Sequence, residues 1–254
     1  MGVLNVTPDS FSDGGQWFDP DQAVEHGRAM VAEGADVVDV GGESSRPGAE
    51  PVPEAEELRR VVPVVEALAP DVRVSVDTVK PAVAEAAVAA GATLVNDVSA
   101  TLAPVAARLG VGYVVMHRQG TPATMQLAPR YDDVVGEVAD FLAREAAAAR
   151  RLGIDEVWID PGIGFGKTID HNLSLLRHLD RLVAVGEPVV VGTSRKSFLG
   201  TLLGRSDGRE GPVPPDDRLE GSLATATWAM ACGARMVRVH DVLPTVRAAK
   251  VVAA

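Results

Sequence analysis

Short apolar runs recur at fairly even spacing along the chain, and each run ends in polar residues or glycine. They are rich in β-branched residues and almost continuously apolar, which is typical of strands that are covered on both faces. The runs are VLNVT (3–7), DVVDVGG (36–42), VRVSVDT (72–78), TLVNDVS (93–99), VGYVVMH (111–117), EVWIDPG (156–162), PVVVGTS (188–194) and RMVRVHD (235–241). The pattern therefore predicts eight buried strands.

The segments between these strands have helical composition. Stretches rich in Ala, Leu, Glu and Arg occupy 19–34, 52–68 and 134–153, and Pro63 should kink the second of them or mark its break. Alternation of strands and helices indicates parallel strands joined by helical crossovers. Eight such units in about 250 residues match the size of a (β/α)8 barrel.

We predict an α/β fold, a (β/α)8 TIM barrel that forms a single domain over residues 1–254. The alternative from pattern alone is an open, doubly wound sheet. We find no linker that divides the chain. The segment RSDGREGPVPPDD (205–217) is typical of a mobile surface loop between helices and is too short to separate domains.

Composition narrows the possible partners. The chain has 254 residues and a formal net charge of −11, which argues against binding to nucleic acid or to an anionic membrane but permits a small anionic substrate. No apolar run approaches the roughly 20 residues needed to cross a bilayer, and we see no secretory signal. The single cysteine, Cys232, excludes an intramolecular disulfide framework. We expect a cytoplasmic protein.

Residues with useful chemistry gather where the predicted strands end. They are Asn5, Glu43 to Arg46, Asp77, Asn96, Asp97, His117, Asp160, Ser194 to Lys196, Arg238 and His240. All strand ends of a parallel barrel share one face, so these side chains should converge on one mouth. Taken alone, Thr78, Asp97 and Ser99 are expected to be helix N-caps. Capping does not explain the whole set.

The stretch DPGIGFGKT (160–168) raises the possibility of a nucleotide phosphate loop. That motif requires a glycine, four further residues and then Gly-Lys-Ser/Thr. The position five residues before Gly166 is Pro161, so the register excludes the motif. The role of Lys167, one of only four lysines in the chain, stays open at this point.

Seven motifs occur in an order that matches a known family from end to end. They are MGVLNVTPDSFSDGG, VDVGGESSRPGA, SVDT, LVNDVS, DPGIGFGKT, GTSRKSFLG and RVHDV. With these motifs the chain resembles the dihydropteroate synthases, pterin-binding enzymes of the folate pathway. The resemblance implies condensation of (7,8-dihydropterin-6-yl)methyl diphosphate with 4-aminobenzoate and release of diphosphate. Family chains usually carry residues before the first motif that cover the barrel floor, so the floor of this chain is left in doubt.

The resemblance also implies three groups of binding residues. For the pterin they are Asp77, Asn96, Asp160, Lys196 and, as an apolar wall, Met116; for the diphosphate they are Asn5, Arg46, Arg238 and His240; for 4-aminobenzoate they are Phe11, Ser45, Pro47, Phe165 and Ser197. Asn5 is also the expected protein ligand of Mg²⁺. Arg238 and His240 could instead form a salt-bridged strand end next to Asp241, and Phe165 could simply pack the turn.

The expected catalytic residues are Asp13, Arg46, Asp77, Asp160 and Lys196. The resemblance implies that the C–O bond breaks before the amine attacks, with the loops 7–15 and 44–49 closing over the site. It also implies a homodimer formed through the last barrel helices; the apolar segment 221–234 fits such an interface or burial against the barrel equally well.

Two rival functions stay open. One is a pterin-binding methyltransferase domain, which would not need the diphosphate and aminobenzoate residues of ESSRPGA and SRKSFLG. The other is a catalytically idle relative that binds pterin as a regulatory protein. Such a relative would be expected to lose Arg46, Lys196 or the first-loop Asn-Thr-Pro-Asp, and all of these are present.

Overall fold

The strands close into a parallel barrel. The structure, a computed structural model, describes residues 1–7, 19–44, 48–121 and 123–254. Its strands are β1 (Gly2–Asn5), β2 (Val37–Gly41), β3 (Arg73–Asp77), β4 (Leu94–Asp97), β5 (Gly112–Met116), β6 (Val157–Asp160), β7 (Val190–Val191) and β8 (Met236–Val237). Strands β1 to β6 form one sheet in chain order, and β7 pairs with β8.

Two isolated parallel bridges join these sheets into a ring. One links Ile159 to Val189 and the other links Gly2 to Val239. The predicted (β/α)8 barrel is therefore confirmed, and the open doubly wound sheet is wrong. The segments predicted for the last two strands are seven residues long, but their ladders contain only two residue pairs.

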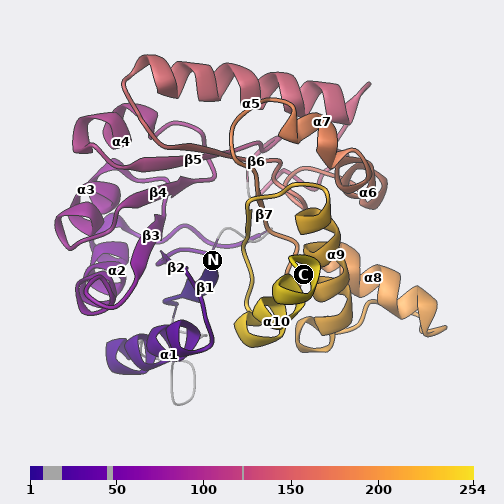
Figure 1. The fold of residues 1–254 in the computed structure, drawn as a ribbon, viewed down its shortest axis with the longest axis horizontal. Helices are drawn as coiled ribbons and strands as arrows, with labels where there is room; N and C mark the ends of the chain where they lie inside the picture. Colours follow the sequence, from indigo (N-terminus) through magenta and orange to yellow (C-terminus); the bar gives the residue numbers. More distant parts are fainter. Residues whose placement is uncertain (8–18, 45–47, 122) are drawn as a thin grey trace.

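Helices surround the strands, with α1 to α4 on one side of the barrel, α5 along another and α6 to α10 opposite the first group (Figure 1). The helical elements are α1 (Pro20–Ala32), α2 (Glu54–Leu68), α3 (Pro81–Ala89), α4 (Ala103–Leu109), α5 (Val134–Arg151), α6 (Ile169–Arg177), α7 (Leu179–Val183), α8 (Ser197–Ser206), the 3-10 helix η1 (Pro215–Asp217), α9 (Leu219–Ala231) and α10 (Val242–Val252). Helix α2 continues through Pro63, so of the two predicted effects of that proline, a kink or a break, the break is wrong.

Local sequence explains several helix starts. The Asp19 side chain accepts a hydrogen bond from the Asp21 N–H at the start of α1, and Thr168 and His171 form a capping box at the start of α6. The segment predicted as a surface loop, 205–217, begins with the last two residues of α8 and ends with η1, and Val213 within it is buried. No helix in the described ranges is long and apolar enough to cross a membrane.

Side-chain alternation along the strands produces two apolar regions. The larger lies between the strands and the helices, whereas a smaller cluster that includes Val37, Leu94, Val114 and Val190 fills the barrel interior. The interior cluster places an apolar layer beneath the strand ends where the polar residues gather.

An ion pair closes the opposite end of the barrel. Arg73, the first residue of β3, donates to both carboxylate oxygens of Glu156 at 2.8 and 2.6 Å. Trp158 Nε1 donates to the same carboxylate at 2.7 Å, and Arg73 Nε donates to Thr93 Oγ1 at 3.1 Å. Arg73 and Glu156, hereafter the floor pair, lie partly exposed at this end of the barrel.

Candidate active site

Four polar residues at the barrel mouth form a hydrogen-bonded cluster. Strand register aligns Asp77 of β3 with Asn96 of β4. Arg238, just after β8, donates from Nε to Asp39 Oδ2 at 2.6 Å and from Nη2 to Asp77 Oδ2 at 2.8 Å. Asn96 Nδ2 donates to the same Asp39 oxygen at 2.9 Å. Asp39, Asp77, Asn96 and Arg238 are hereafter the mouth cluster.

The mouth cluster has more carboxylate oxygens than the hydrogen-bond donors of the described residues can satisfy. Asp39 is completely buried, and its Oδ1 atom has no hydrogen-bond partner among the described residues. Burial raises the pKa of Asp77, and the nearby Arg238 guanidinium opposes that rise. Two acids therefore share one guanidinium in a low-dielectric environment, which favours a ligand that supplies further N–H donors.

Asp160 and Lys196 form the second part of the mouth. Burial raises the pKa of Asp160, and the Lys196 ammonium is the largest influence in the opposite direction. Burial lowers the pKa of Lys196 to about 8, and Asp160 opposes that shift. Each group therefore opposes the shift that burial causes in the pKa of the other, and both lie at the mouth where a ligand can contact them.

The segment before α8 places Lys196 next to the turn after β6. Arg195 adopts a left-handed φ of 59°, and its carbonyl accepts a hydrogen bond from Arg218 Nη1 at 2.8 Å. Lys196 then donates to the Ile163 carbonyl and lies 4.8 Å from the centre of the Phe165 ring. Ser197 is the exposed first residue of α8.

The turn Gly162–Gly166, hereafter the glycine turn, lies against the chain that follows β5. A Cβ atom on Gly162 would lie 1.9 Å from the His117 carbonyl oxygen, and one on Gly166 would lie 2.3 Å from the Gln119 carbonyl oxygen. Both glycines also have positive φ angles, of 63° and 64°. Glycine is therefore required here for close backbone approach and for the turn conformation.

Lys167 lies beneath the glycine turn. It is 3% exposed, and its Nζ atom lies 2.9 Å from His117 Nδ1, 3.0 Å from the Gly162 carbonyl oxygen and 3.1 Å from the Phe165 carbonyl oxygen. These protein acceptors surround the ammonium. A lysine held in this way does not extend towards a nucleotide phosphate, which agrees with the register argument from the sequence.

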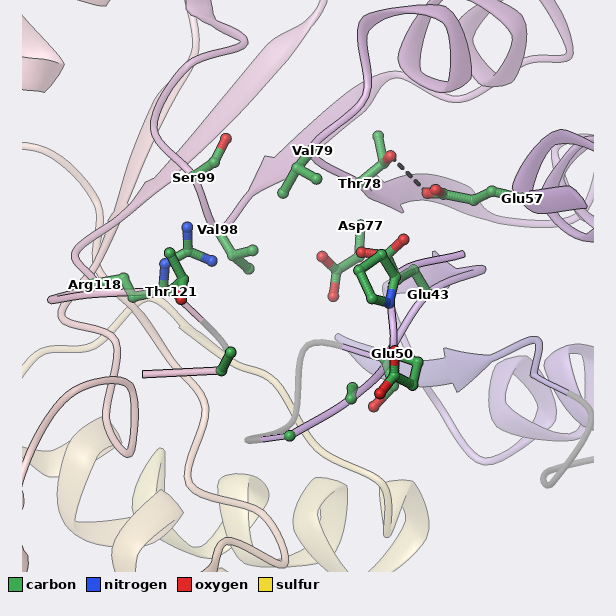
Figure 2. A pocket seen from close by; sticks show the side chains of 15 residues that line it. Glu43, Glu50, Glu57, Asp77, Thr78, Val79, Val98, Ser99, Arg118 and Thr121 are labelled. Carbon is green, nitrogen blue, oxygen red and sulfur yellow. Dashed lines mark hydrogen bonds between the residues drawn. The ribbon is translucent and has the colours of Figure 1, made fainter. Parts of the chain in front are cut away.

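A pocket of about 600 Å³ opens beside the mouth cluster, lined by the segments that follow β2 to β5. Figure 2 shows Asp77 between the acidic side chains of Glu43 and Glu50 and the wall formed by Val98 and Arg118. Its lining residues in the described chain include Arg118 as the single basic residue. With Glu43, Glu50, Glu57 and Asp77 in its lining, the pocket therefore suits a ligand with N–H donors.

A second network, partly buried, joins Glu43 after β2 to α2 and to the segment after β3. Lys80 Nζ donates to Glu43 Oε2 at 2.5 Å and also to Glu57, and Thr78 Oγ1 donates to Glu57 at 2.6 Å. Glu43 Oε2 further accepts from the Val52 N–H at 2.9 Å, so one carboxylate joins both ends of the segment after β2. Sequence reasoning missed this network and missed Asp39; the signal for Asp39 was a single acid inside an apolar strand.

The predicted helix caps are wrong in detail. Helix α3 begins after Lys80 and α4 begins after Leu102, so neither Thr78 nor Ser99 is an N-cap. Asp97 instead accepts hydrogen bonds from the N–H groups of Thr101 at 2.6 Å and Leu102 at 2.7 Å, and from Tyr113. Asp97 stabilises the turn before α4 rather than capping the helix directly, because four residues, 98–101, separate it from Leu102, after which α4 begins.

The remaining predicted residues divide into three groups. Asn5 and Met116 end β1 and β5 at the mouth, with Met116 buried. His240 Nδ1 lies 3.0 Å from Ser194 Oγ, and Asp241 pairs with Arg195 at 2.6 Å rather than with Arg238. Outside the described residues lie Phe11, Asp13, Ser45, Arg46 and Pro47.

The barrel and its mouth define a class of protein. It is a TIM barrel whose strand ends form an acidic site with too few hydrogen-bond donors and with two adjacent cations, Arg238 and Lys196. The model of the family described as "Pterin binding enzyme" matches residues 1–240. The chain belongs to this family.

Individual relatives agree with that assignment. The dihydropteroate synthase of Escherichia coli strain K12 is 47% identical over 262 residues, covering 100% of this chain and 90% of the relative. A Yersinia pestis dihydropteroate synthase solved with a sulfonamide drug complex has a TM-score of 0.91 at 46% identity, covering 99% of this chain and 92% of the other. A Xanthomonas albilineans dihydropteroate synthase solved with 4-aminobenzoic acid has a TM-score of 0.88 at 48% identity, covering 98% and 90%.

Proposed function

We propose that this chain is a dihydropteroate synthase that joins 4-aminobenzoate to (7,8-dihydropterin-6-yl)methyl diphosphate and releases diphosphate. Relatives with that name match its whole length, and one was solved with 4-aminobenzoic acid. The observation that carries the proposal is the placement of Asp77, Asn96, Asp160 and Lys196 around one mouth. The whole chain, 1–254, acts as one catalytic domain, with small molecules rather than nucleic acid or membrane as partners.

The pterin binds through groups that complement its edge. A pterin has a guanidine-like edge of N–H donors, for which Asp77, Asn96 and Asp160 supply acceptors, and a carbonyl that Lys196 approaches. Met116 supplies an apolar wall. The unsatisfied oxygen of Asp39 supports this assignment, because a cluster rich in acceptors gains from additional donors.

The diphosphate binds near Asn5, Arg46, Arg238 and His240. In the structure Arg238 is held by Asp39 and Asp77, so it is oriented at the mouth while its charge is shared between two acids. Arg46 adds a guanidinium, which suits phosphate through its bidentate geometry.

Mg²⁺ fits this site as a substrate-bound ion. The described residues contain no cluster of three His, Cys, Asp or Glu side chains that could hold a metal. Asn5, at the end of β1, offers one amide oxygen, which suits an ion that takes its other ligands from diphosphate and water. When bound, the ion supplies charge neutralisation for the departing diphosphate.

The reaction proceeds by loss of diphosphate and then attack by the amine. Arg238, Arg46 and His240 stabilise the negative charge that develops on the leaving group. Asp160 and Asp77 hold the pterin while positive charge spreads from its methylene carbon into the ring. The 4-aminobenzoate lies among Phe11, Ser45, Pro47, Phe165 and Ser197, with its carboxylate at the N-terminal end of α8. Asp13 and Arg46 assist when loops 7–15 and 44–49 close.

The chain also forms a homodimer through its last barrel helices. Trp228 on α9 is 52% exposed, and Leu243 on α10 is also exposed. Large exposed apolar side chains on adjacent helices favour burial against a second copy. Sedimentation analysis of the wild type and of Trp228→Glu would test this, since a monomer in both cases rejects the dimer.

A coupled assay for diphosphate release tests the proposed activity. Release should require the pterin diphosphate, 4-aminobenzoate and Mg²⁺ together, and chromatography should detect dihydropteroate in equal amount. Diphosphate release that does not depend on 4-aminobenzoate, with no pteroate formed when both substrates are present, would reject a synthase. Pterin binding without any turnover would instead support the regulatory relative, and methyl transfer from methyltetrahydrofolate would support the methyltransferase domain.

A further inference from the structure

We propose that Lys167 is a positioning residue that holds the glycine turn so that Phe165 and the Ile163 carbonyl meet Lys196, and that it thereby sets the affinity for the second substrate. This inference rests on the proposed synthase function. It concerns a residue that neither the pterin nor the diphosphate assignment uses.

Acceptors surround the Lys167 Nζ atom; burial lowers the pKa of this group to about 7, and the nearby Asp160 carboxylate opposes that shift. Its Nζ atom lies near four acceptors: His117 Nδ1 and the carbonyl oxygens of Gly162 and Phe165, within 3.1 Å, and the His117 carbonyl oxygen at 3.4 Å. An ammonium has three donors and no acceptor, so it suits an environment made of acceptors. Burial, followed by the Lys167 charge, lowers the pKa of His117 to about 3, so that ring is neutral and accepts through Nδ1.

These acceptors belong to two separate segments. His117 follows β5, whereas Gly162 and Phe165 belong to the turn after β6. The backbones of the two segments approach so closely at Gly162 that a Cβ atom would collide with the His117 carbonyl. Lys167 therefore fastens the glycine turn to its neighbour at the point of closest approach.

The other side of the turn faces Lys196. Lys196 donates to the Ile163 carbonyl, and its ammonium lies 4.8 Å from the centre of the Phe165 ring. Phe165 is thus held from beneath through its carbonyl by Lys167, and its ring lies against Lys196. A shift of the turn would displace both groups at once.

Other contacts to the turn hold different atoms. Asn172 Oδ1 accepts from the Gly164 N–H at 2.7 Å, and Tyr131 donates to the Gly166 carbonyl at 2.8 Å. Neither touches the Phe165 carbonyl. Because the Lys167 ammonium is enclosed by protein acceptors beneath the turn, it acts through Phe165 and Lys196 and not by touching a substrate.

Replacement of Lys167 by an apolar side chain of similar length tests this role. Lys167→Met should raise the KM for 4-aminobenzoate by roughly 10- to 100-fold, the penalty for misplacing a positioning group by about 1 Å. The Kd of the pterin diphosphate, measured by calorimetry without 4-aminobenzoate, should rise much less, because Asp77 and Asn96 on β3 and β4 lie outside the turn, although Lys196 and Asp160 contact it. Lys167→Arg, which keeps a cation and its donors, should raise the KM for 4-aminobenzoate less than Lys167→Met does. Lys250→Met, an exposed lysine on α10, is the matched control.

The outcomes separate this inference from the proposed activity. An inactive wild type rejects the synthase, whereas an active wild type with an unchanged Lys167→Met variant rejects the positioning role. Equal loss of pterin affinity and of aminobenzoate affinity in Lys167→Met also rejects it, since that result indicates general disruption. If Lys167→Met does not fold, His117→Phe removes one acceptor while keeping an aromatic ring, and it should show the same selective rise in KM at smaller size; no rise there overturns the inference.

Discussion

The two ends of the barrel each contain a buried or half-buried arginine with carboxylates, yet they are built differently. At the floor, Arg73 and Glu156 form a one-to-one bidentate pair, and their side chains are 32% and 38% exposed. At the mouth, Arg238 serves both Asp39 and Asp77, and Asp39 is completely buried. The floor pair is balanced in charge and in hydrogen bonds, whereas the mouth cluster is not.

This difference separates a structural ion pair from a binding site. Partly exposed pairs contribute little free energy and leave nothing for a ligand to satisfy. A buried cluster with more acids than guanidinium groups is costly in the free protein, because charged and polar groups lose water without full compensation. The surrounding barrel holds the mouth cluster in that state, and a ligand with N–H donors can then supply the missing hydrogen bonds.

The largest expected effect is a loss of stability, and it distinguishes the arginine at the mouth from the arginine at the floor. Arg238→Met should lower the free energy of unfolding by ~3–5 kcal/mol, since it leaves two carboxylates near one another without their cation. Arg73→Met should cost no more than about 1 kcal/mol. Urea unfolding of both variants and of the wild type measures the contrast.

The pH dependence sharpens that contrast. Burial already raises the pKa of Asp77 above its usual 3.8, and loss of Arg238 removes the main opposing influence. A native carboxyl with a raised pKa holds a proton that the unfolded chain has released, so stability falls as pH rises above about 4. Arg238→Met should therefore be destabilised more at pH 8 than at pH 5, and equal costs at both values would contradict this account.

Asp160→Asn should give the next largest effect. The amide keeps the shape of the side chain but removes the negative charge that holds the cationic pterin, so kcat should fall by about 100-fold or more. Glu156→Gln, near the start of the same strand at the floor, is the matched control and should keep the wild-type kcat. A wild-type kcat in Asp160→Asn would remove Asp160 from the mechanism.

Lys196 should produce a smaller effect that depends on pH. Burial lowers the pKa of Lys196 to about 8 from the usual 10.5, so the ammonium is lost as pH rises through that value. Pterin diphosphate affinity should weaken by several-fold between pH 7 and about 9. Calorimetry across this range should show the change in the wild type and in Lys250→Met, and a flat profile in Lys196→Met. A flat wild-type profile would show that the ammonium does not bind the ligand.

The smallest effect is expected at the floor. Hydrogen bonds from Arg73 lower the pKa of Glu156, so its stabilising contribution is present above its usual pKa of 4.5 and is lost as pH falls through the lower folded value. Glu156→Gln should cost less than about 1 kcal/mol at pH 7. The difference in unfolding free energy between Glu156→Gln and the wild type should disappear in acid. A loss of stability at pH 7 as large as that of Arg238→Met would contradict the distinction between the two ends of the barrel.

Sequence pattern predicted most of the barrel because strand burial leaves a direct trace in hydrophobicity. Convergence of Asp77, Asn96 and Asp160 followed from parallel topology alone. The short ladders of β7 and β8 were not visible, since continuous apolar residues such as PVVV do not reveal where pairing ends.

Features that depend on three-dimensional register were missed. The floor pair joins residues 83 positions apart, and only barrel closure brings them together. Lys167 carries no signal of its own in the sequence, because its acceptors are backbone carbonyls whose direction depends on the positive φ angles of the glycine turn. Asp39 could have been noticed as a charge in an apolar strand, but its pairing with Arg238 could not have been predicted from the sequence.

The Arg238–Asp39 hydrogen bond has a consequence for how the protein folds. It joins positions 199 residues apart, from beyond the last strand to the second strand, across β1. Contacts of such separation form late, after the entropy of closing a long loop has been overcome. The ligand site is therefore completed only when the ring is closed, and a partly folded chain has the acids of the first strands without the guanidinium that organises them.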